Sequence, residues 1–367
     1  MIPQISPRPS TGRRTLSIIG TQRRDPVHAA ARLSRFLNDQ DASGDPGDLV
    51  RGLQHRVAEV TGKEAALLLP TGTMAQQIAL RVHSERRRTT EFAAHPTCHM
   101  LNYEFDGYAV VHGLRVHRLG ETHRLFDGTD LAAMPSTVGS VVWELPQREL
   151  GGILPAWDEL VSQVDAARAA GAATHLDGAR LWEAAAGYNR TAAEIAALFD
   201  TVYVSLYKSL EAPRGAVIAG DRDVIRDVWT WAVRLGGDSS GNWPLAAFGL
   251  MALDELLPRM PRYLDHARAI AHAIVATGLA EVVPAVPETA IVHVHLPFPA
   301  ERVAAAHETI AHERGIQLFR APRVTTTGSC FFEIAVGESA LEIEPHEVTD
   351  ALVALAELAA SPSCDPR

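Results

Sequence analysis

Residues 175–180 read His-Leu-Asp-Gly-Ala-Arg, and further along the chain Lys208 stands in the segment Val-Ser-Leu-Tyr-Lys-Ser. Both features come at the end of a short apolar run, at 173–176 and at 202–207. Short apolar runs that alternate with helical segments are typical of buried parallel strands, whose carboxyl ends meet at one edge of the sheet. We therefore expect Asp177 and Lys208 to lie at the same edge, on neighbouring strands.

A carboxylate and an amine at one sheet edge are the groups that a pyridoxal phosphate (PLP) site needs. A lysine holds the aldehyde of PLP as a Schiff base, and a carboxylate keeps the pyridine nitrogen protonated so that the ring accepts electrons. Asp177 and Lys208 are the candidates. Taken singly, they could be a turn residue and a solvated charge. Their combination with Arg180, Ser205 and the turn at 71–73 favours the PLP site.

The turn Thr71-Gly72-Thr73 follows a predicted strand at 65–69 and precedes a helix expected from Met74 to about Val82. Backbone N–H groups at the start of a helix, together with the helix dipole, bind anions. This turn is therefore a candidate phosphate site, and Ser205 is a second one. The alternative for the turn alone is an ordinary strand-to-helix connection capped by threonine.

The segment His95-Pro96-Thr97-Cys98-His99 offers an imidazole, that of His99, which could stack on the cofactor ring. Its two histidines also stand four positions apart, as metal ligands on a helix do. The intervening proline interrupts a regular helix and no third ligand is spaced nearby, so we expect no metal. His293 and His295 share one face of a predicted strand and are expected to be partly buried structural residues.

The bulk composition describes a folded protein that acts on small molecules. The chain has 367 residues, is 47% hydrophobic and carries a net charge of -10 without a basic stripe, which argues against a nucleic-acid partner. No apolar run reaches the length of a membrane span, and the start of the chain lacks a signal-peptide pattern. The three cysteines have no metal-like or disulfide-like spacing. We expect a cytoplasmic protein.

The turn-forming residues and the pattern of expected elements predict three parts: an N-terminal arm at 1–45, a large PLP-binding domain at 46–275, and a small C-terminal domain at 276–367. Strand and helix patterns alternate in the large domain to about residue 220, which indicates an open, mostly parallel sheet covered on both faces. A loop rich in turn formers occupies 236–244. Further elements are expected as follows: a helix near His28 to Leu37, helices over 225–275, strands at 291–295 and 331–336, a helix around 301–313 and a final helix at 345–360.

The sequence resembles the threonine aldolase/β-eliminating lyase family of fold-type I PLP enzymes. The resemblance covers more than half of the chain and is carried by these segments: Gly62-Lys63-Glu64-Ala65-Ala66, Thr71 to Ala75, Cys98-His99, Gly151-Gly152, His175 to Leu181, and Lys208 with Ala212-Pro213. It implies the α/β fold of the aspartate aminotransferase type, with a smaller α+β C-terminal domain.

The resemblance also implies a role for each matching position. The catalytic residues would be Lys208, as the Schiff-base lysine, and His99, stacked on the ring. The cofactor would be bound by Gly72, Thr73, His99, Asp177, Ser205 and Lys208. Arg180 would bind the substrate carboxylate, and Gln147 would also contact the substrate. Family sites lie at a subunit boundary, so a homodimer or homotetramer is implied, and Arg234 with the 236–244 loop could reach a neighbour's phosphate.

The chain departs from the family pattern in three places. Gln147 stands at or near the position of a histidine in many members, and glutamine cannot act as a base. The strand at 330–334 reads Cys-Phe-Phe-Glu-Ile and lacks the arginine that helps to grip the substrate carboxylate. The N-terminal segments 6–9 and 38–45 differ from the Arg-Ser-Asp-Thr and acidic stretches of threonine aldolases. These departures place the chain in a divergent branch.

The leading functional hypothesis is a PLP-dependent lyase that cleaves a threonine-like β-hydroxy-α-amino acid into glycine and an aldehyde. The proton of the β-hydroxyl would pass to His99 or to a water held near Gln147 or Glu144, and the sequence leaves this choice open. The alternatives are other PLP chemistry on a different amino acid, namely β-elimination, racemisation or aldehyde transfer, and a PLP-binding protein without catalysis.

Overall fold

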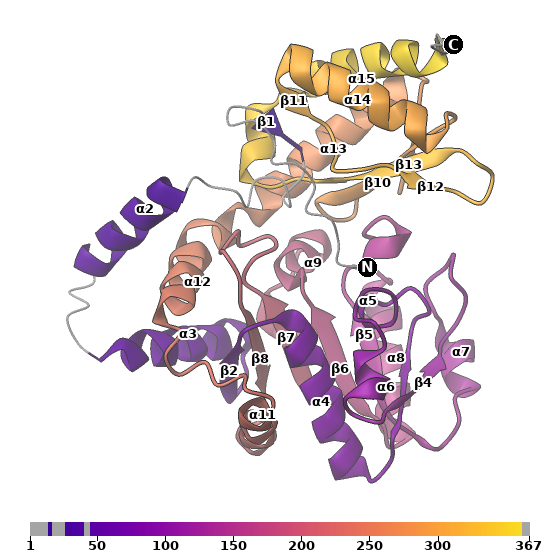
Figure 1. Ribbon diagram of the computed structural model, residues 1–367. Coiled ribbons are helices and arrows are strands. Elements are labelled where there is room, and N and C mark those ends of the chain that lie inside the picture. Colours follow the sequence, from indigo (N-terminus) through magenta and orange to yellow (C-terminus); the bar gives the residue numbers. More distant parts are fainter. Residues whose placement is uncertain (1–13, 17–25, 40–44, 362–367) are drawn as a thin grey trace. The chain divides into compact units, whose positions relative to one another are not determined.

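The computed structural model describes residues 14–16, 26–39 and 45–361. Contacts within the chain divide it into a large unit, 24–261, and a small unit, 1–23 with 262–367 (Figure 1). The helix α13 (Met260–Ala276) thus falls almost wholly in the small unit by this division. The domain boundaries expected after residues 45 and 275 stay a prediction.

The large unit is built on one open sheet of seven strands in the order β2-β8-β7-β6-β5-β3-β4. The pairs from β7 through to β4 are all parallel, whereas β8 pairs antiparallel with both β2 and β7. The central strands β5, β6 and β7 are almost continuously buried, as expected for strands covered on both faces. The strands are β2 (Ala65–Leu69), β3 (Glu91–Ala94), β4 (Arg115–Arg118), β5 (Val138–Glu144), β6 (Ala173–Gly178), β7 (Thr201–Ser205) and β8 (Ala216–Gly220).

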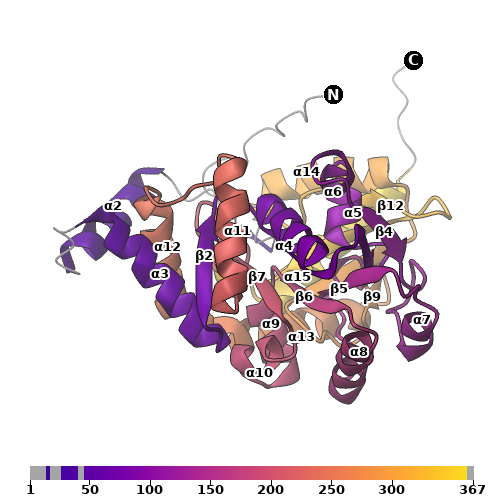
Figure 2. The same cartoon turned by 90° about the horizontal axis from the view of Figure 1, so that it is seen from below.

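Helices cover both faces of this sheet (Figure 2). The helices α4 and α11 contact each other and pack on one face, while α3, α8 and α10 pack on the other. The expected α/β fold with a mostly parallel sheet is confirmed. The helices are α2 (Pro26–Asp39), α3 (Pro46–Thr61), α4 (Gly72–Arg87), α5 (His99–Tyr103), α6 (Gly107–Val110), α7 (Gly128–Ala132), α8 (Trp157–Ala169), α9 (Leu181–Tyr188), α10 (Ala192–Ala196), α11 (Arg222–Arg234) and α12 (Trp243–Glu255), with short 3₁₀ turns η1 (Arg148–Leu150) and η2 (Leu257–Arg259).

The helix α4 is longer than its apolar pattern predicts. It begins at Gly72 and not at Met74, because the Thr71 side chain accepts a hydrogen bond from the Met74 N–H and caps the first turn. It runs to Arg87, beyond the expected end near Val82, because its last turn is solvated and polar residues continue a helix without an apolar stripe. The strand β2 matches its predicted range.

The two strands that carry the diagnostic residues are neighbours and parallel, as expected. Their ends differ from the prediction. The strand β6 extends to Gly178, so Asp177 lies inside it and not after it. The strand β7 ends at Ser205, two residues earlier than expected, and Lys208 lies in the connection that turns back into β8.

The small unit contains a four-stranded antiparallel sheet and three long helices. The sheet order is β12-β13-β10-β9, and a short parallel pair joins β1 to β11. His293 and His295 lie on one face of β10, and both rings contact Phe331, as expected for structural histidines. The remaining elements are β1 (Arg14–Thr15), β9 (Glu281–Val283), β10 (Ile291–Leu296), β11 (Ile316–Gln317), β12 (Arg323–Val324), β13 (Cys330–Ala335), α14 (Ala300–Arg314), η3 (Glu338–Glu342) and α15 (Pro345–Ala360).

Some composition-based expectations can be compared with the described residues. Cys98 and Cys330 are buried free thiols, and Cys364 lies outside the described part of the chain. Within the described ranges, no helix combines the length and apolarity needed to cross a bilayer. The segment 6–9 and most of the stretch at 38–45 also lie outside the described residues.

Candidate active site

Three polar side chains form a row across the carboxyl-terminal ends of β5, β6 and β7. Glu144 is paired in register with Asp177, and Asp177 with Tyr203. Registered neighbours in a sheet project to the same face. His175, two residues before Asp177 in β6, contacts Gln76 of α4, so this is the face that α4 covers. The row therefore lies on the α4 side of the sheet.

The first turn of α4 stands against this row. An atom added as Cβ at Gly72 would lie 2.1 Å from the Tyr203 hydroxyl oxygen, so only glycine permits this approach of helix and strand. In the first turn of a helix the backbone N–H groups, here those of Gly72 and Thr73, have no preceding carbonyl to bind. Ser205 shares the face of Tyr203 on β7 because it lies two residues further on. We call the N–H groups of Gly72 and Thr73, with Ser205, the anion cradle, a candidate site for a phosphate.

Lys208 is partly buried in the β7–β8 connection, which is folded tightly by the backbone bonds from Glu211 N to Lys208 O and from Ala212 N to Leu206 O. Burial and the charge of Arg180 together lower the pKa of Lys208 to about 8, while Asp177 and Glu144 oppose the shift. A lysine with this pKa has an appreciable neutral fraction near pH 7, which makes its amine nucleophilic.

Lys208 has one competitor, because the whole sequence contains two lysines. The other, Lys63, follows the end of α3 and donates a hydrogen bond to the Phe199 carbonyl oxygen. Burial also lowers the pKa of Lys63, with Asp221 and Asp200 opposing. None of the charges that act on Lys63 belongs to the Glu144–Asp177–Tyr203 row.

Glu144 is a carboxyl group whose pKa is raised well above its usual value. Burial, together with the Asp177 charge beside it, raises the pKa of Glu144 to about 7. Its Oε2 accepts a hydrogen bond from the His99 backbone N–H (3.0 Å) and its Oε1 accepts one from the Arg148 N–H (3.4 Å). Two adjacent carboxylates in a sheltered site resist double ionisation, so Glu144 exchanges a proton near neutral pH.

His99 begins the short helix α5 and is held by a hydrogen-bonded chain. Its Nδ1 lies 3.3 Å from Glu104 Oε1, and Gln77 Nε2 of α4 donates to Glu104 Oε2 (2.9 Å). The His99 ring also contacts the Tyr103 ring, with 5.2 Å between centroids. His99 is thereby tied to the cofactor-side helix α4, while its side chain stays 31% exposed and open to a ligand.

Gln147 is buried among polar partners. It is 2% exposed, and its Nε2 donates to Thr97 Oγ1 (3.1 Å), which in turn contacts His95 Nδ1 (2.8 Å). His95 Nε2 lies 2.7 Å from the Arg124 carbonyl oxygen. Gln147 therefore belongs to a buried series of hydrogen bonds, and its contact with a substrate stays a prediction. His95 and His99 are bound to different partners.

Arg180, which ends the diagnostic segment, is 6% exposed and lies near Glu183 of α9, with 3.7 Å between Nε and Oε1. Ser209, next to Lys208, donates a hydrogen bond to the same Glu183 oxygen. The Arg180 Nε has no hydrogen-bond partner among the described residues. A buried guanidinium next to the lysine is placed to receive an anionic group.

The described residues fit PLP. The cradle at Gly72 admits a phosphate, Asp177 supplies a carboxylate within the sheet, and the amine of Lys208 is in the electrostatic field of that carboxylate. The donor set does not fit a metal, and the described residues contain no group of three or more histidine, cysteine, aspartate or glutamate side chains that could hold one.

The sequence reading missed Tyr203 and Glu104. Tyr203 could have been found, because it lies two positions before Ser205 and a strand repeats its face every second residue. Glu104 had no comparable signal, since α5 is one turn long and its end cannot be located from a repeat.

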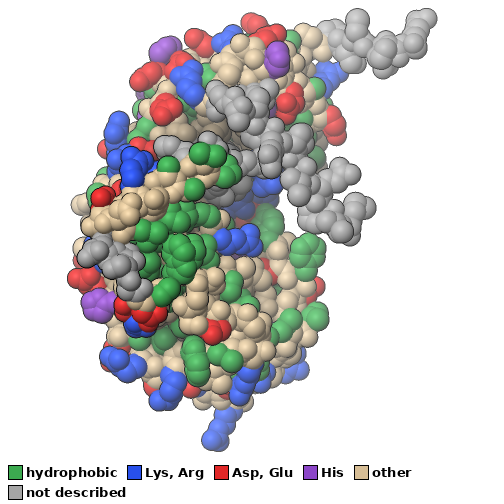
Figure 3. Space-filling view, turned by 60° about the vertical axis from the view of Figure 1, so that its left-hand side comes forward, with side chains coloured by type: hydrophobic (Ala, Val, Ile, Leu, Met, Phe, Trp, Pro, Cys, Tyr) green, Lys and Arg blue, Asp and Glu red, His purple; other side chains and the backbone are tan. Residues whose placement is uncertain are grey.

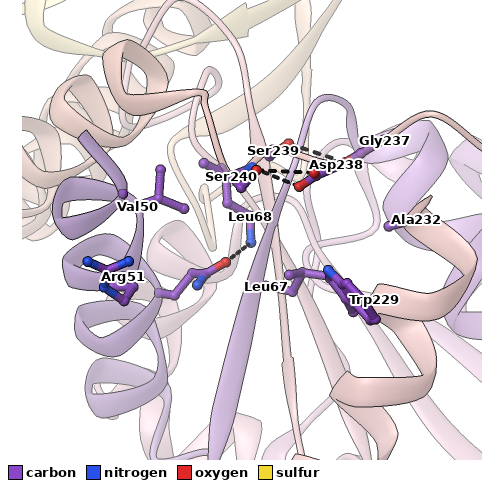
Figure 4. A pocket seen from close by; sticks show the side chains of 12 residues that line it. Val50, Arg51, Leu67, Leu68, Trp229, Ala232, Gly237, Asp238, Ser239 and Ser240 are labelled. Carbon is purple, nitrogen blue, oxygen red and sulfur yellow. Dashed lines mark hydrogen bonds between the residues drawn. The ribbon is translucent and has the colours of Figure 1, made fainter. Parts of the chain in front are cut away.

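A separate hollow of about 200 Å³ lies at the free edge of β2, lined by α3, α11 and the loop at 237–240 (Figure 4). Gln54 Oε1 accepts from the Leu68 N–H there, so this edge strand is partly capped. None of the candidate active-site residues lines this hollow among the described residues. Arg234 packs over the Trp231 ring, 4.8 Å from its centroid, and its reach to a neighbour stays a prediction.

Comparison with known proteins gives a consistent result. The family model of the beta-eliminating lyases matches residues 27–297, more than half of the chain. The chain is 30% identical over 257 residues to a low specificity L-threonine aldolase of Escherichia coli K12, covering 68% of this chain and 75% of the relative. A solved structure from Listeria monocytogenes, provisionally assigned as an L-allo-threonine aldolase, superposes with a TM-score of 0.85 at 30% identity, covering 94% of this chain and 95% of that one. An alanine racemase from Cochliobolus carbonum is 32% identical over 212 residues, 54% of this chain and 52% of the relative.

Proposed function

The chain belongs to the beta-eliminating lyase family, and from this premise we propose that it is a PLP-dependent carbon–carbon lyase which cleaves a threonine-like β-hydroxy-α-amino acid into glycine and an aldehyde. One observation carries the proposal most directly. The amine of Lys208, with its pKa lowered to about 8, lies in the field of Asp177, Glu144 and Arg180. An amine, two carboxylates and a guanidinium in one sheltered place are the groups that this chemistry requires.

Pyridoxal phosphate, when bound, supplies an electron-accepting ring that stabilises the charge left at Cα as a bond there breaks. Lys208 would hold it covalently, Asp177 would pair with its pyridine nitrogen, and the α4 N-terminus with Ser205 would bind its phosphate. His99 would face the ring. These assignments extend to this chain the roles of matching residues in the family.

Arg180 would select which bond at Cα breaks. A guanidinium binds a carboxylate through two parallel hydrogen bonds, which fixes the orientation of the amino acid. With the carboxylate fixed, the side chain can be held perpendicular to the ring, the orientation in which the Cα–Cβ bond is weakened. The buried position of Arg180 supports this role, because exclusion of water strengthens the contact.

The proton of the β-hydroxyl needs an acceptor near Cβ. Gln147 cannot serve, since its amide has no basic atom and donates to Thr97. Glu144 is suited to the task because its pKa of about 7 lets it accept and release a proton at neutral pH. His99, whose backbone N–H binds Glu144, is the second acceptor in reach. We propose Glu144 as the acceptor, directly or through water.

A second function, racemisation of an amino acid at Cα, has one observation in its favour. A relative at 32% identity is named an alanine racemase. Racemisation breaks the Cα–H bond and leaves Cβ intact, so the two functions differ in their products. Release of glycine and an aldehyde distinguishes the lyase.

We further propose that the enzyme is a cytoplasmic homo-oligomer, a dimer or a tetramer. Apolar side chains gather on the face of the large unit that carries α12 (Figure 3). The partly exposed residues of α12 include Leu245, Phe248 and Leu250. A contiguous apolar surface of partly exposed side chains is typical of a protein contact. The free thiols of Cys98 and Cys330 agree with a reducing compartment.

The experiment that tests the function is a titration of the PLP-loaded protein with L-threonine, L-allo-threonine and phenylserine. Glycine and aldehyde are assayed in the same samples, and alanine of each hand serves as the racemase substrate. Equal amounts of glycine and aldehyde support the lyase and rank the side chains. A protein that binds PLP but releases neither product from any of the three would refute the proposed reaction.

A further inference from the structure

A buried hydrogen-bonded chain of four side chains lies beneath the candidate active site and takes no part in the chemistry proposed above. It consists of Gln76 and His83 of α4, His175 of β6 and Thr201 of β7. All four are at most 3% exposed. His175 Nε2 lies 2.8 Å from Gln76 Oε1, and His175 Nδ1 lies 2.8 Å from Thr201 Oγ1. His83 Nε2 lies 2.7 Å from the same hydroxyl.

The donors and acceptors in this hydrogen-bonded chain determine which ring nitrogen of each histidine carries the proton. With the Gln76 oxygen as acceptor, His175 carries its proton on Nε2 and accepts at Nδ1 from the Thr201 hydroxyl. The hydroxyl oxygen then accepts from His83 Nε2. Both rings are neutral in this arrangement. Burial agrees with it, because it lowers the pKa of His175 to about 3 and that of His83 to about 4.

The buried hydrogen-bonded chain connects parts of the site that are far apart in the amino-acid sequence. Gln76 lies one helical turn after Gly72, on the segment that begins the anion cradle. His175 lies two residues before Asp177 on the same face of β6. His83, by contrast, lies three turns into α4, away from the cradle. The bond between His175 and Gln76 thus links the first turns of α4 to β6 beside Asp177, in addition to the close approach of Gly72 to Tyr203.

We propose that His175 is a positioning residue for the phosphate end of the cofactor. It holds the N-terminus of α4, through Gln76, at the distance from Asp177 that PLP spans. The inference rests on the proposed function and deepens it, since it names a residue that sets the cofactor geometry without touching the cofactor.

The test compares two substitutions on the same helix. Gln76→Met and His83→Met each replace a buried polar side chain of α4 and each remove one hydrogen bond to the strands. The affinity of each variant is measured for PLP and for pyridoxal, which lacks the phosphate, together with the melting temperature. Gln76→Met should weaken PLP binding on the order of tenfold while pyridoxal binding changes little, because the phosphate cradle moves relative to Asp177. His83→Met should leave both affinities near the wild-type values.

A second variant keeps the test open if Gln76→Met does not fold. His175→Asn retains an amide that can reach Thr201 but is too short to reach Gln76, and it should show the same selective loss for PLP. Equal losses for PLP and pyridoxal, or equal effects of Gln76→Met and His83→Met, would refute the positioning role. A wild-type protein that does not bind PLP at all would instead remove the proposed function, and this inference with it.

Discussion

Because His83 is buried, we predict that it lowers the free energy of unfolding at acid pH, by an amount that can be worked out from the structure. The pKa of His83 is lowered to about 4, mainly by burial; Asp200 opposes this shift, and Arg87 and Arg86 contribute to it. In the unfolded chain a histidine titrates near 6.5. At a pH between these two pKa values, the histidine is protonated in the unfolded state and neutral in the folded state. The free energy of unfolding therefore falls as the pH drops below about 6.5, and the loss is complete near pH 4.

The substitution His83→Met removes this acid penalty. Each pH unit costs about 1.4 kcal/mol, so the wild type loses about 2 kcal/mol through His83 between pH 6.5 and pH 5. The variant avoids that loss but gives up the bond to Thr201, at a pH-independent cost of about 1 kcal/mol. We expect the variant to be less stable than the wild type at pH 7 and more stable at pH 5.

Urea unfolding followed by tryptophan fluorescence measures this difference, because all six tryptophans lie between residues 143 and 243 in the large unit. Acid-sensitive groups that do not interact with His83 are present in both proteins and cancel in the comparison. The charge of His83 also lowers the pKa of His175, so its removal relieves the acid penalty of His175 in the same direction. The quantity of interest is the difference in unfolding free energy at pH 7 and at pH 5. A difference that stays constant over this range would show that His83 is not held neutral, and the reasoning would fail.

Three further substitutions probe the site. Gly72→Ala should weaken PLP binding and lower the stability by about 1 to 3 kcal/mol, because its Cβ would meet the Tyr203 hydroxyl; a PLP dissociation constant and a melting temperature equal to those of the wild type would contradict the close approach. Glu144→Gln should lower kcat on the order of 100-fold and remove the fall in kcat that we expect in the wild type below about pH 7, where Glu144 becomes protonated and can no longer accept; a pH–rate profile with the same acid limb in both proteins would exclude Glu144 as acceptor. Arg180→Lys should raise KM roughly 10- to 100-fold with a smaller effect on PLP affinity, because a lysine cannot make the two parallel contacts; an unchanged KM would exclude Arg180 from the carboxylate site.

The sheet order around the site was within reach of the sequence, because the apolar runs before Asp177 and Lys208 are short, buried and separated by helical segments. The exact ends of those strands could not be predicted from the sequence. Hydrophobicity cannot distinguish the last residue of β7 from the tight connection that follows, so Lys208 was expected at the strand end and lies three residues beyond it.

The buried hydrogen-bonded chain could not be predicted at all. Gln76 and His175 are 99 positions apart, and their contact depends on how α4 crosses β6. No sequence pattern indicates that a glutamine in a helix and a histidine in a strand will form a hydrogen bond with each other. The turn at 71–73 is an intermediate case: its place between a strand and a helix was predictable, whereas the Tyr203 hydroxyl that makes Gly72 obligatory was not.

The central claim is that Lys208 carries the cofactor, and the presence of two lysines in the chain makes it directly testable. The PLP-loaded protein is reduced with borohydride, which makes the bond between cofactor and lysine permanent, then digested and mapped by mass spectrometry. We expect the added mass on the peptide that contains Lys208, with none on the peptide that contains Lys63. Modification at Lys63, or at neither lysine while PLP remains bound, would contradict the account.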